Sequence, residues 1–167
     1  FDVLTNLPNR ALFYDRLDQA VARARRYQQK FAVMFLDLDG FKRVNDEFGH
    51  HAGDCLLKMA AERLAASARD MDTVARVGGD EFIFILNNVD HADNVILVAN
   101  KILESLSRPF VVQENTCSIG CSIGISIFPD DTDDAEALIK MADDAMYMAK
   151  KDGRNNYQFF NAQQGTA

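Results

Sequence analysis

Four carboxylates occur in two short clusters at places where strands are predicted to end or turn. Asp37 and Asp39 follow an apolar run, and Asp80 and Glu81 lie on the turn between two further runs. If these strands are neighbours in one sheet, the carboxylates meet at one edge of it and raise one another's pKa. A hard divalent cation relieves such repulsion, because Mg²⁺ prefers oxygen ligands. Two such ions a few ångströms apart can clamp an in-line phosphoryl displacement.

Aspartate is also common in turns and on surfaces, so each carboxylate has a plainer interpretation. For Asp39 we favour that interpretation, with the side chain as a local cap for the following helix. For Asp37, Asp80 and Glu81 we favour a functional role, because an apolar strand that ends in Asp is unusual for solvation alone. The two glycines before Asp80 leave room for a ligand or simply form a hairpin turn, and that pair alone decides neither.

The hydrophobic pattern predicts elements in the order α-β-α-α-β-β-α-β-α-β. Helices are expected over residues 11–29, 41–48, 53–68, 93–107 and 134–151, and strands over 31–36, 73–76, 82–86, 117–127 and 156–160. The first strand is a continuous apolar run, which is typical of a strand buried on both faces. The order matches an α+β fold: a ferredoxin-like βαββαβ palm with a central, mostly antiparallel sheet, helices on one face, an extra hairpin and an N-terminal helix.

The segment 117–127 alternates strictly between two kinds of residue. Isoleucine and cysteine occupy one face, while serine and glycine occupy the other. Small residues on one face indicate that a helix or a neighbouring backbone approaches it closely.

Length and charge exclude several classes of protein. The chain has 167 residues, of which 48% are hydrophobic, and a net charge of −7. This size fits one domain. The acidic balance argues against nucleic acid or an anionic membrane as a partner, although divalent ions can still bridge the protein to phosphates. No apolar run approaches the ~20 residues that span a bilayer, and a chain that starts at Phe1 without Met is expected to be a piece of a longer protein.

The cysteines indicate neither a disulfide framework nor a zinc site, because their number is odd and no C-x-x-C pair occurs. Cys117 and Cys121 lie on one predicted strand about 13 Å apart, beyond the roughly 7 Å limit for a disulfide. We expect all three, Cys55 included, to be small buried side chains in a reducing cytoplasm.

The turn Gly78-Gly79-Asp80-Glu81-Phe82 spells the signature of the GGDEF family, the diguanylate cyclases, and the sequence resembles that family from Asp2 to about Phe160. The other blocks that carry the resemblance are Asp2-x-Leu4-Thr5-x-Leu7-Pro8-Asn9-Arg10, Asp37-x-Asp39-x-Phe41-Lys42-x-x-Asn45-Asp46-x-x-Gly49-His50-x-x-Gly53-Asp54, Ser122-Ile123-Gly124-Ile125 and Ala142-Asp143-x-Ala145-Met146-Tyr147-x-Ala149-Lys150-x-x-Gly153-Arg154-Asn155. The resemblance implies a fold like that of adenylyl cyclases and polymerase palms. It implies a catalytic domain over 1–160, with 161–167 a polar tail toward a missing C-terminal region.

The resemblance also implies a metal site. Asp37, the Leu38 carbonyl, Asp80 and Glu81 would hold Mg²⁺ or Mn²⁺. Asp80 or Glu81 would help to deprotonate the attacking 3′-hydroxyl, and the sequence does not separate the two. Lys42 would neutralise charge that develops on the phosphates.

For the substrate GTP, the resemblance implies a guanine site and a phosphate site. Asn45 and Asp54 would contact the guanine, since Asp can accept from its N–H groups. The remaining contacts would come from His50 and the glycines Gly78 and Gly79, with the triphosphate held by Lys150 and Arg154. Plainer interpretations remain for Asn45 as a helix-end residue, and for the two cations because positive charge is favoured near a helix C-terminus.

Two such domains would face each other as a homodimer and condense two GTP into cyclic di-GMP, releasing two pyrophosphates. Arg69 and Asp72 resemble the family's product-inhibition site, although an R-x-x-D string alone is often a chance i, i+3 ion pair. One alternative is an inactive module that senses GTP or cyclic di-GMP and regulates an attached EAL phosphodiesterase domain. Another is a cyclase that makes a cyclic mononucleotide. The domain is expected in the cytoplasm, within a parent protein that carries sensor domains and can be membrane-anchored through its missing regions.

Overall fold

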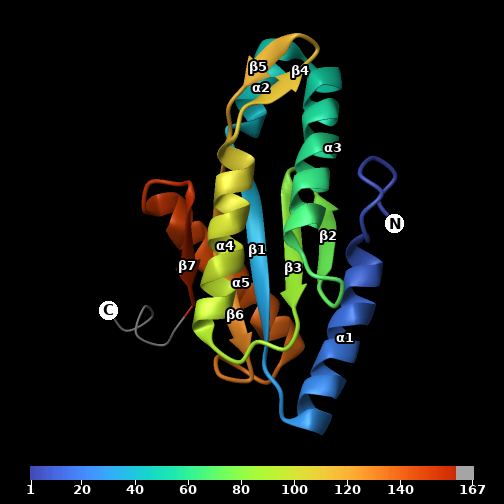
Figure 1. The fold of residues 1–167 in the computed structure, drawn as a ribbon, viewed down its shortest axis with the longest axis vertical. Helices are drawn as coiled ribbons and strands as arrows, with labels where there is room; N and C mark the ends of the chain where they lie inside the picture. The colour runs from blue at the N-terminus through green and yellow to red at the C-terminus, as the bar shows by residue number, and fades with distance from the viewer. Residues whose placement is uncertain (161–167) are drawn as a thin grey trace.

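The computed structural model describes residues 1–160, and the tail predicted over 161–167 lies outside the described residues. Figure 1 shows the elements in chain order. The helices are α1 (Arg10–Tyr27), α2 (Phe41–Phe48), α3 (His50–Ser67), α4 (Ala92–Ser107) and α5 (Ala135–Lys151). The strands are β1 (Phe31–Asp39), β2 (Thr73–Gly78), β3 (Glu81–Leu86), β4 (Phe110–Val112), β5 (Asn115–Cys117), β6 (Gly120–Phe128) and β7 (Asn156–Phe159).

The main sheet has five strands in the order β2-β3-β1-β6-β7, so β1 lies at its centre. β1 is antiparallel to β3 and to β6, and only β7 runs parallel to its neighbour. The predicted α+β palm with a mostly antiparallel sheet is therefore confirmed. β1 ends at Asp39 and not at residue 36, because its last residues still pair with β6, Asp39 opposite Gly120. The carboxylates of Asp37 and Asp39 thus belong to the strand itself.

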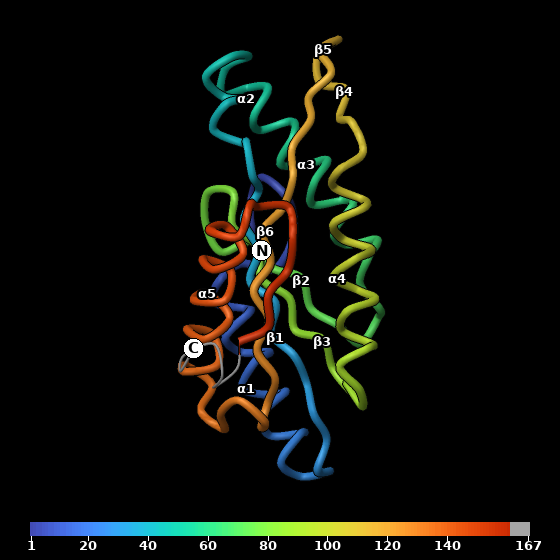
Figure 2. Tube along the Cα trace, turned by 90° about the vertical axis from the view of Figure 1, so that its left-hand side faces the viewer, coloured from blue at the N-terminus to red at the C-terminus, as the bar shows by residue number. Residues whose placement is uncertain are grey.

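Helices cover both faces of the sheet, so the prediction of helices on one face was wrong. Figure 2 shows α3 and α4 on one side of the strands and α1 and α5 on the other. On β1, Ala32, Met34 and Leu36 pack into the core beneath α3 and α4. Val33 and Phe35 pack into a second core beneath α1 and α5. Because successive side chains of a strand point to opposite faces, an apolar run of this kind needs cover on both.

The segment predicted as one strand over 117–127 is divided between two sheets. β5 ends at Cys117 and pairs with β4 in a separate hairpin, whereas β6 begins at Gly120 and pairs with β1. The alternation of side chains runs through the break, because both halves stay extended, and it therefore gave no sign of the change of partner. The small-residue face is confirmed: a Cβ on Gly124 would lie 1.9 Å from the carbonyl oxygen of Ala142 in α5.

Side chains fix the start of two helices that border the sheet. Asn9 caps α1 by accepting from the Leu12 N–H at 3.0 Å, and Asp134 caps α5 by accepting from the Ala137 N–H at 2.9 Å. Such caps satisfy donors that a helix start leaves free. The three cysteines are free thiols, and within 1–160 no helix is long and apolar enough to cross a membrane.

Candidate active site

The pairing of β1 with β3 brings the two carboxylate clusters together. Asp37 stands opposite Glu81 in the antiparallel register, and the Leu38 N–H donates to the Asp80 carbonyl at 3.2 Å. The short turn after β2 sets where β3 starts, because the chain re-enters the sheet at Glu81 directly after Gly79 and Asp80. Residues far apart in sequence thus meet at one end of the sheet, as the sequence predicted.

Negative charge is crowded at this end. Burial, followed by the charge of Asp37 and a hydrogen bond with it, raises the pKa of Asp80 from 3.8 to about 6. Burial and the charges of Asp37 and Asp143 also raise the pKa of Glu81. Lys150 from α5 forms an ion pair with Asp37, yet the Asp37 Oδ1 atom is buried and has no hydrogen-bond partner. An unpaired buried carboxylate oxygen is costly unless a cation meets it.

The carboxylate oxygens at this end of the sheet are suited to binding a divalent cation. Among the described residues no three His, Cys, Asp or Glu side chains already converge as a complete ligand set. However, the free Oδ1 of Asp37 and the crowded carboxyl of Asp80 are hard oxygen donors of the kind Mg²⁺ binds. A bound cation would offset the repulsion from Asp37, which after burial is the next cause of the raised pKa of Asp80.

The sequence interpretation gave no role to Asp143, which lies near the carboxylates of Asp37, Asp80 and Glu81. We call this end of the sheet the carboxylate corner. Burial first, and then the charge of Asp144, raise its pKa, and the charge of Asp37 adds to that effect. Asp143 precedes Lys150 by seven residues on α5, which is two helical turns, so both side chains point to the same face. That spacing was the signal from which its position could have been inferred.

The glycine turn is open on its outer side and anchored on its inner side. Neither Gly78 nor Gly79 has an atom within 4 Å of an added Cβ, and Gly79 has a left-handed φ of 46°. The Arg76 guanidinium donates to the Gly79 carbonyl at 2.9 and 2.8 Å and to Asp2 at 3.2 Å. The N-terminal segment therefore helps to fix the turn through Arg76, a contact that sequence analysis missed because its partners are 74 residues apart.

The residues expected at the guanine lie where α2 meets α3. Asn45 is half-buried on α2, and its side-chain oxygen would lie 1.7 Å from a Cβ on Gly53, so the amide rests on the backbone of α3. Asp54, the next residue of that helix, is exposed. His50 is exposed at the start of α3, which begins there and not at 53 as predicted.

The expected phosphate ligands lie at different distances from the carboxylates. Lys150 contacts Asp37 directly, whereas the Arg154 Nη1 atom lies 4.0 Å from Asp39 and its side chain is 60% exposed. Lys42 is exposed on the first turn of α2, and within 1–160 no ion pair joins it to the carboxylates. The structure thus places Lys150 in contact with the carboxylates, whereas Lys42, in the part of the chain that the structure describes, makes no ion pair with them.

The expected role of Asp39 as a cap for α2 was wrong. Gly40 occupies the cap position, and no side chain makes a capping hydrogen bond there. Asp39 instead accepts from the Ser122 Oγ atom at 2.9 Å and from the Asn155 N–H at 2.9 Å. Its partners come from β6 and from the loop after α5, so local sequence gave no sign of them.

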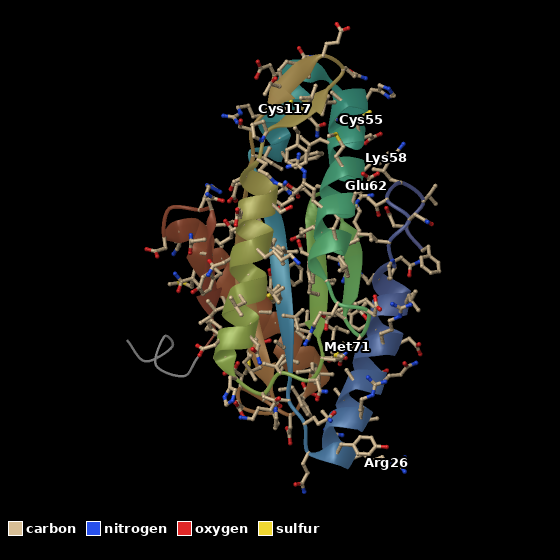
Figure 3. The ribbon with its side chains drawn as sticks, in the orientation of Figure 1. Arg26, Cys55, Lys58, Glu62, Met71 and Cys117 are labelled. Atoms are coloured by element: carbon tan, nitrogen blue, oxygen red, sulfur yellow. The ribbon has the colours of Figure 1, made fainter. Side chains whose placement is uncertain are left out.

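Arg69 and Asp72 form a second charged cluster at the other end of β2. The Arg69 guanidinium donates to both Asp72 oxygens at 2.9 and 3.0 Å and to the Asn87 carbonyl at 2.6 Å. The Asp72 side chain is completely buried, while that of Arg69 remains 45% exposed. Met71, labelled in Figure 3, marks this end of the sheet beside α1. A cavity of about 440 Å³ adjoins Asp72, and α1 lines it with Arg16 and Arg23.

Comparison with known proteins agrees with this geometry. Residues 1–156 match the family model "Diguanylate cyclase, GGDEF domain". The bifunctional diguanylate cyclase/cyclic di-GMP phosphodiesterase MucR of Pseudomonas aeruginosa is 48% identical over 96% of this chain, which spans 23% of that protein. The GGDEF domain of TpbB from the same organism superposes with a TM-score of 0.95 at 37% identity, covering 99% of this chain and 96% of that one.

A third relative was solved with a nucleotide. The GGDEF domain of DgcB from Caulobacter crescentus, in complex with c-di-GMP, has a TM-score of 0.87 at 31% identity and covers 95% of this chain and 94% of that one. The chain described here belongs to the GGDEF domain family, the diguanylate cyclases, which are enzymes of the nucleotidyltransferase type.

Proposed function

We propose that this domain condenses two GTP molecules into cyclic di-GMP with release of two pyrophosphates. The observation that carries the proposal is the corner of Asp37, Asp80 and Glu81, where a buried carboxylate oxygen has no partner and the pKa of Asp80 rises to about 6. Buried carboxylate oxygens are normally hydrogen-bonded, so one without a partner among crowded carboxylates at a strand end indicates a site for a charged ligand.

Each condensation forms a bond from one 3′-oxygen to the α-phosphorus of the other GTP and breaks the bond to the pyrophosphate. Asp37, Asp80, Glu81 and the Leu38 carbonyl would hold Mg²⁺ or Mn²⁺, which when bound would polarise the phosphate oxygens. Asp80 or Glu81 takes the proton of the 3′-hydroxyl, a role for which a raised carboxylate pKa is suited. Because one domain holds one GTP, the second comes from a facing copy in a homodimer.

The remaining residues bind and orient the nucleotide. Asn45 and Asp54 contact the guanine edge at the α2–α3 junction, with His50 beside them, and the open faces of Gly78 and Gly79 admit the nucleotide. Lys150 and Arg154 hold the triphosphate, and Lys42 approaches it from α2. Positioning and charge neutralisation of this kind account for most of the catalysis in phosphoryl transfer.

A direct test incubates the domain with GTP and Mg²⁺ and identifies the products by mass. We expect two pyrophosphates for each cyclic di-GMP, and a rate that rises when two copies are fused into a dimer. Pyrophosphate absent even from the fused dimer would contradict the proposal. A cyclic mononucleotide would instead identify a different cyclase.

We propose further that Arg69 and Asp72 bind the product and inhibit synthesis. The support is a guanidinium that Asp72 holds in place through Nε and Nη2 and that is still 45% exposed, so that its Nη1 donors can contact a guanine or a phosphate. Replacing Arg69 with Ala should preserve initial synthesis and abolish inhibition by added cyclic di-GMP. Inhibition unchanged in that variant would refute the assignment.

A sensing module is the second candidate, because MucR couples a domain like this one to phosphodiesterase activity and this chain spans only 23% of it. In that case the domain would bind GTP or cyclic di-GMP and regulate an attached EAL domain, with sensor domains elsewhere in the parent protein. We place the domain in the cytoplasm, where GTP is available. Binding of GTP without pyrophosphate release would favour this candidate.

A further inference from the structure

Asp39 is the most connected carboxylate at the end of β1, although the reaction above gives it no role. Its side chain is only 9% exposed. Both of its oxygens lie 2.9 Å from the Ser122 Oγ atom, and one accepts from the Asn155 N–H at 2.9 Å. The Arg154 guanidinium lies at 4.0 Å. Donors from β6 and from the loop after α5 therefore converge on one carboxylate.

The loop that Asp39 holds is strained and carries a proposed phosphate ligand. Arg154 and Asn155 have positive φ angles of 63° and 47°. This conformation is unfavourable for a non-glycine side chain such as that of Arg154. Asn156 supports the loop from the other side, donating to the Arg154 carbonyl at 2.8 Å. Two strained residues in a row persist only when outside contacts fix them, and Asp39 supplies the contact to Asn155.

Each of the two aspartates at the end of β1 lies close to one of the two proposed phosphate ligands. Asp37 and Asp39 are two residues apart and point to the same face of the strand. Asp37 pairs with Lys150, and Asp39 stands opposite Arg154. Because 4.0 Å is too long for a strong hydrogen bond, Asp39 attracts the guanidinium without using its donors. Those donors stay available to a phosphate.

We propose that Asp39 is a positioning residue that orients Arg154 toward the triphosphate of bound GTP. This inference rests on the proposed function, since it needs GTP at the carboxylate corner. Asp39 acts in two ways, by fixing the backbone of the loop through the Asn155 N–H and by attracting the guanidinium itself.

The test is a double-mutant cycle of Asp39→Asn and Arg154→Met, read as KM and kcat for GTP and as affinity for a non-hydrolysable GTP analogue. Misplacing a ligand in this way should raise KM by about 10-fold, with kcat changed by less than about 2-fold because Arg154 binds substrate and transition state alike. In the Arg154→Met background, Asp39→Asn should have no further effect. A general loss of structure would be additive and would not spare kcat.

Asp152→Asn is the matched control, because it removes a carboxylate from the same loop that contacts Gln158 and not Arg154. Its KM should stay at the wild-type value. Asp39→Glu provides a second variant that keeps the charge and displaces it by one methylene, in case Asp39→Asn does not fold. It too should raise KM only while Arg154 is present.

Additive effects in the cycle, or an unchanged KM in Asp39→Asn, would overturn the proposal. An unchanged KM in Arg154→Met with synthesis intact would overturn it as well, while leaving the cyclase activity standing. A domain that binds GTP without making product would fail the proposed function but still test Asp39, because the analogue affinity is measured without turnover.

Discussion

The two ends of β2 carry the same types of residue in opposite states. At the glycine turn, Asp80 and Glu81 crowd Asp37, which keeps one buried oxygen without a partner. At the other end, Asp72 accepts from the backbone and guanidinium of Arg69 and from the Asn87 N–H at 3.0 Å. We call the first cluster, Asp37, Asp80 and Glu81, the open end, because its negative charge is not balanced. We call the second, Arg69 and Asp72, the closed end, because its carboxylate is fully hydrogen-bonded.

This contrast separates groups that bind a ligand directly from groups that hold a neighbouring side chain in position. An unpaired carboxylate stores unfavourable free energy that a cation can release, so the open end is built to change state on binding. A fully bonded carboxylate has no such free energy to release, so Asp72 keeps Arg69 in place whether or not a ligand is present. Mutations at the two ends should therefore separate activity from stability.

The largest expected effect is at the open end. Replacing Asp80 with Asn should lower the rate of cyclic di-GMP synthesis by about 10²- to 10³-fold. The substitution removes a carboxylate proposed to bind the metal ion that stabilises the charge developing on the phosphate. The melting temperature should not fall, since the substitution also removes repulsion with Asp37. Product formation by mass and a thermal melt give the two readouts. A variant that loses stability together with activity would contradict the contrast.

The closed end should show the reverse pattern. Replacing Asp72 with Ala leaves the Asn87 N–H and the Arg69 guanidinium without their partner and should lower the free energy of unfolding by about 1–3 kcal/mol. Initial synthesis at low product concentration should stay near the wild-type rate. Urea denaturation measures the loss, and the exposed neighbour Asp70→Ala is the control, expected to change stability by less than about 0.5 kcal/mol.

Sequence alone predicted the open end better than the closed end or the supporting contacts. Asp37 and Asp80 were predicted to meet because an apolar run marks the end of one strand and a glycine turn marks the start of another, and both signals are visible in the sequence. The Asn155 contact to Asp39 spans 116 residues, and the Arg76 contact to Asp2 spans 74. Such pairs depend on how the loops lie after the sheet has formed, which periodicity does not encode.

The layering of the fold was missed for a related reason. The apolar run of β1 predicted burial on both faces, but the order of elements alone did not show which helix lies on which side. Gly124 held the stronger clue, since a Cβ there would collide with the backbone of α5. Composition of a strand face thus indicates how closely something packs, and the identity of that neighbour needs the tertiary structure.

A metal titration should sharpen the contrast further. Mg²⁺ at about ten times its Kd should raise the free energy of unfolding by about 1.4 kcal/mol, because it binds the folded site and not the unfolded chain. Asp72→Ala should retain this shift and Asp80→Asn should lose most of it. Thermal melts with EDTA and with Mg²⁺ measure each difference. An equal shift in both variants would place the ion elsewhere.

The smallest expected effect is the pH dependence of stability in EDTA. Between pH values of about 4 and 6 the folded domain holds more protons than the unfolded chain, since burial and then the charge of Asp37 raise the pKa of Asp80 from 3.8 to about 6. Stability therefore falls as the pH rises through this window. Because Asp80 is only half-buried, we expect a loss of about 1 kcal/mol.

Asp80→Asn cannot lose this proton, so it should be the more stable protein above pH 6 and should match the wild type near pH 4. Urea denaturation of the two proteins across this range isolates Asp80, because every other titrating group is common to both. A difference that does not vary with pH would mean that folding leaves the pKa of the Asp80 carboxyl at its ordinary value. In that case repulsion from Asp37 would be too weak to define an open site, and the contrast between the two ends of β2 would rest on Asp37 alone.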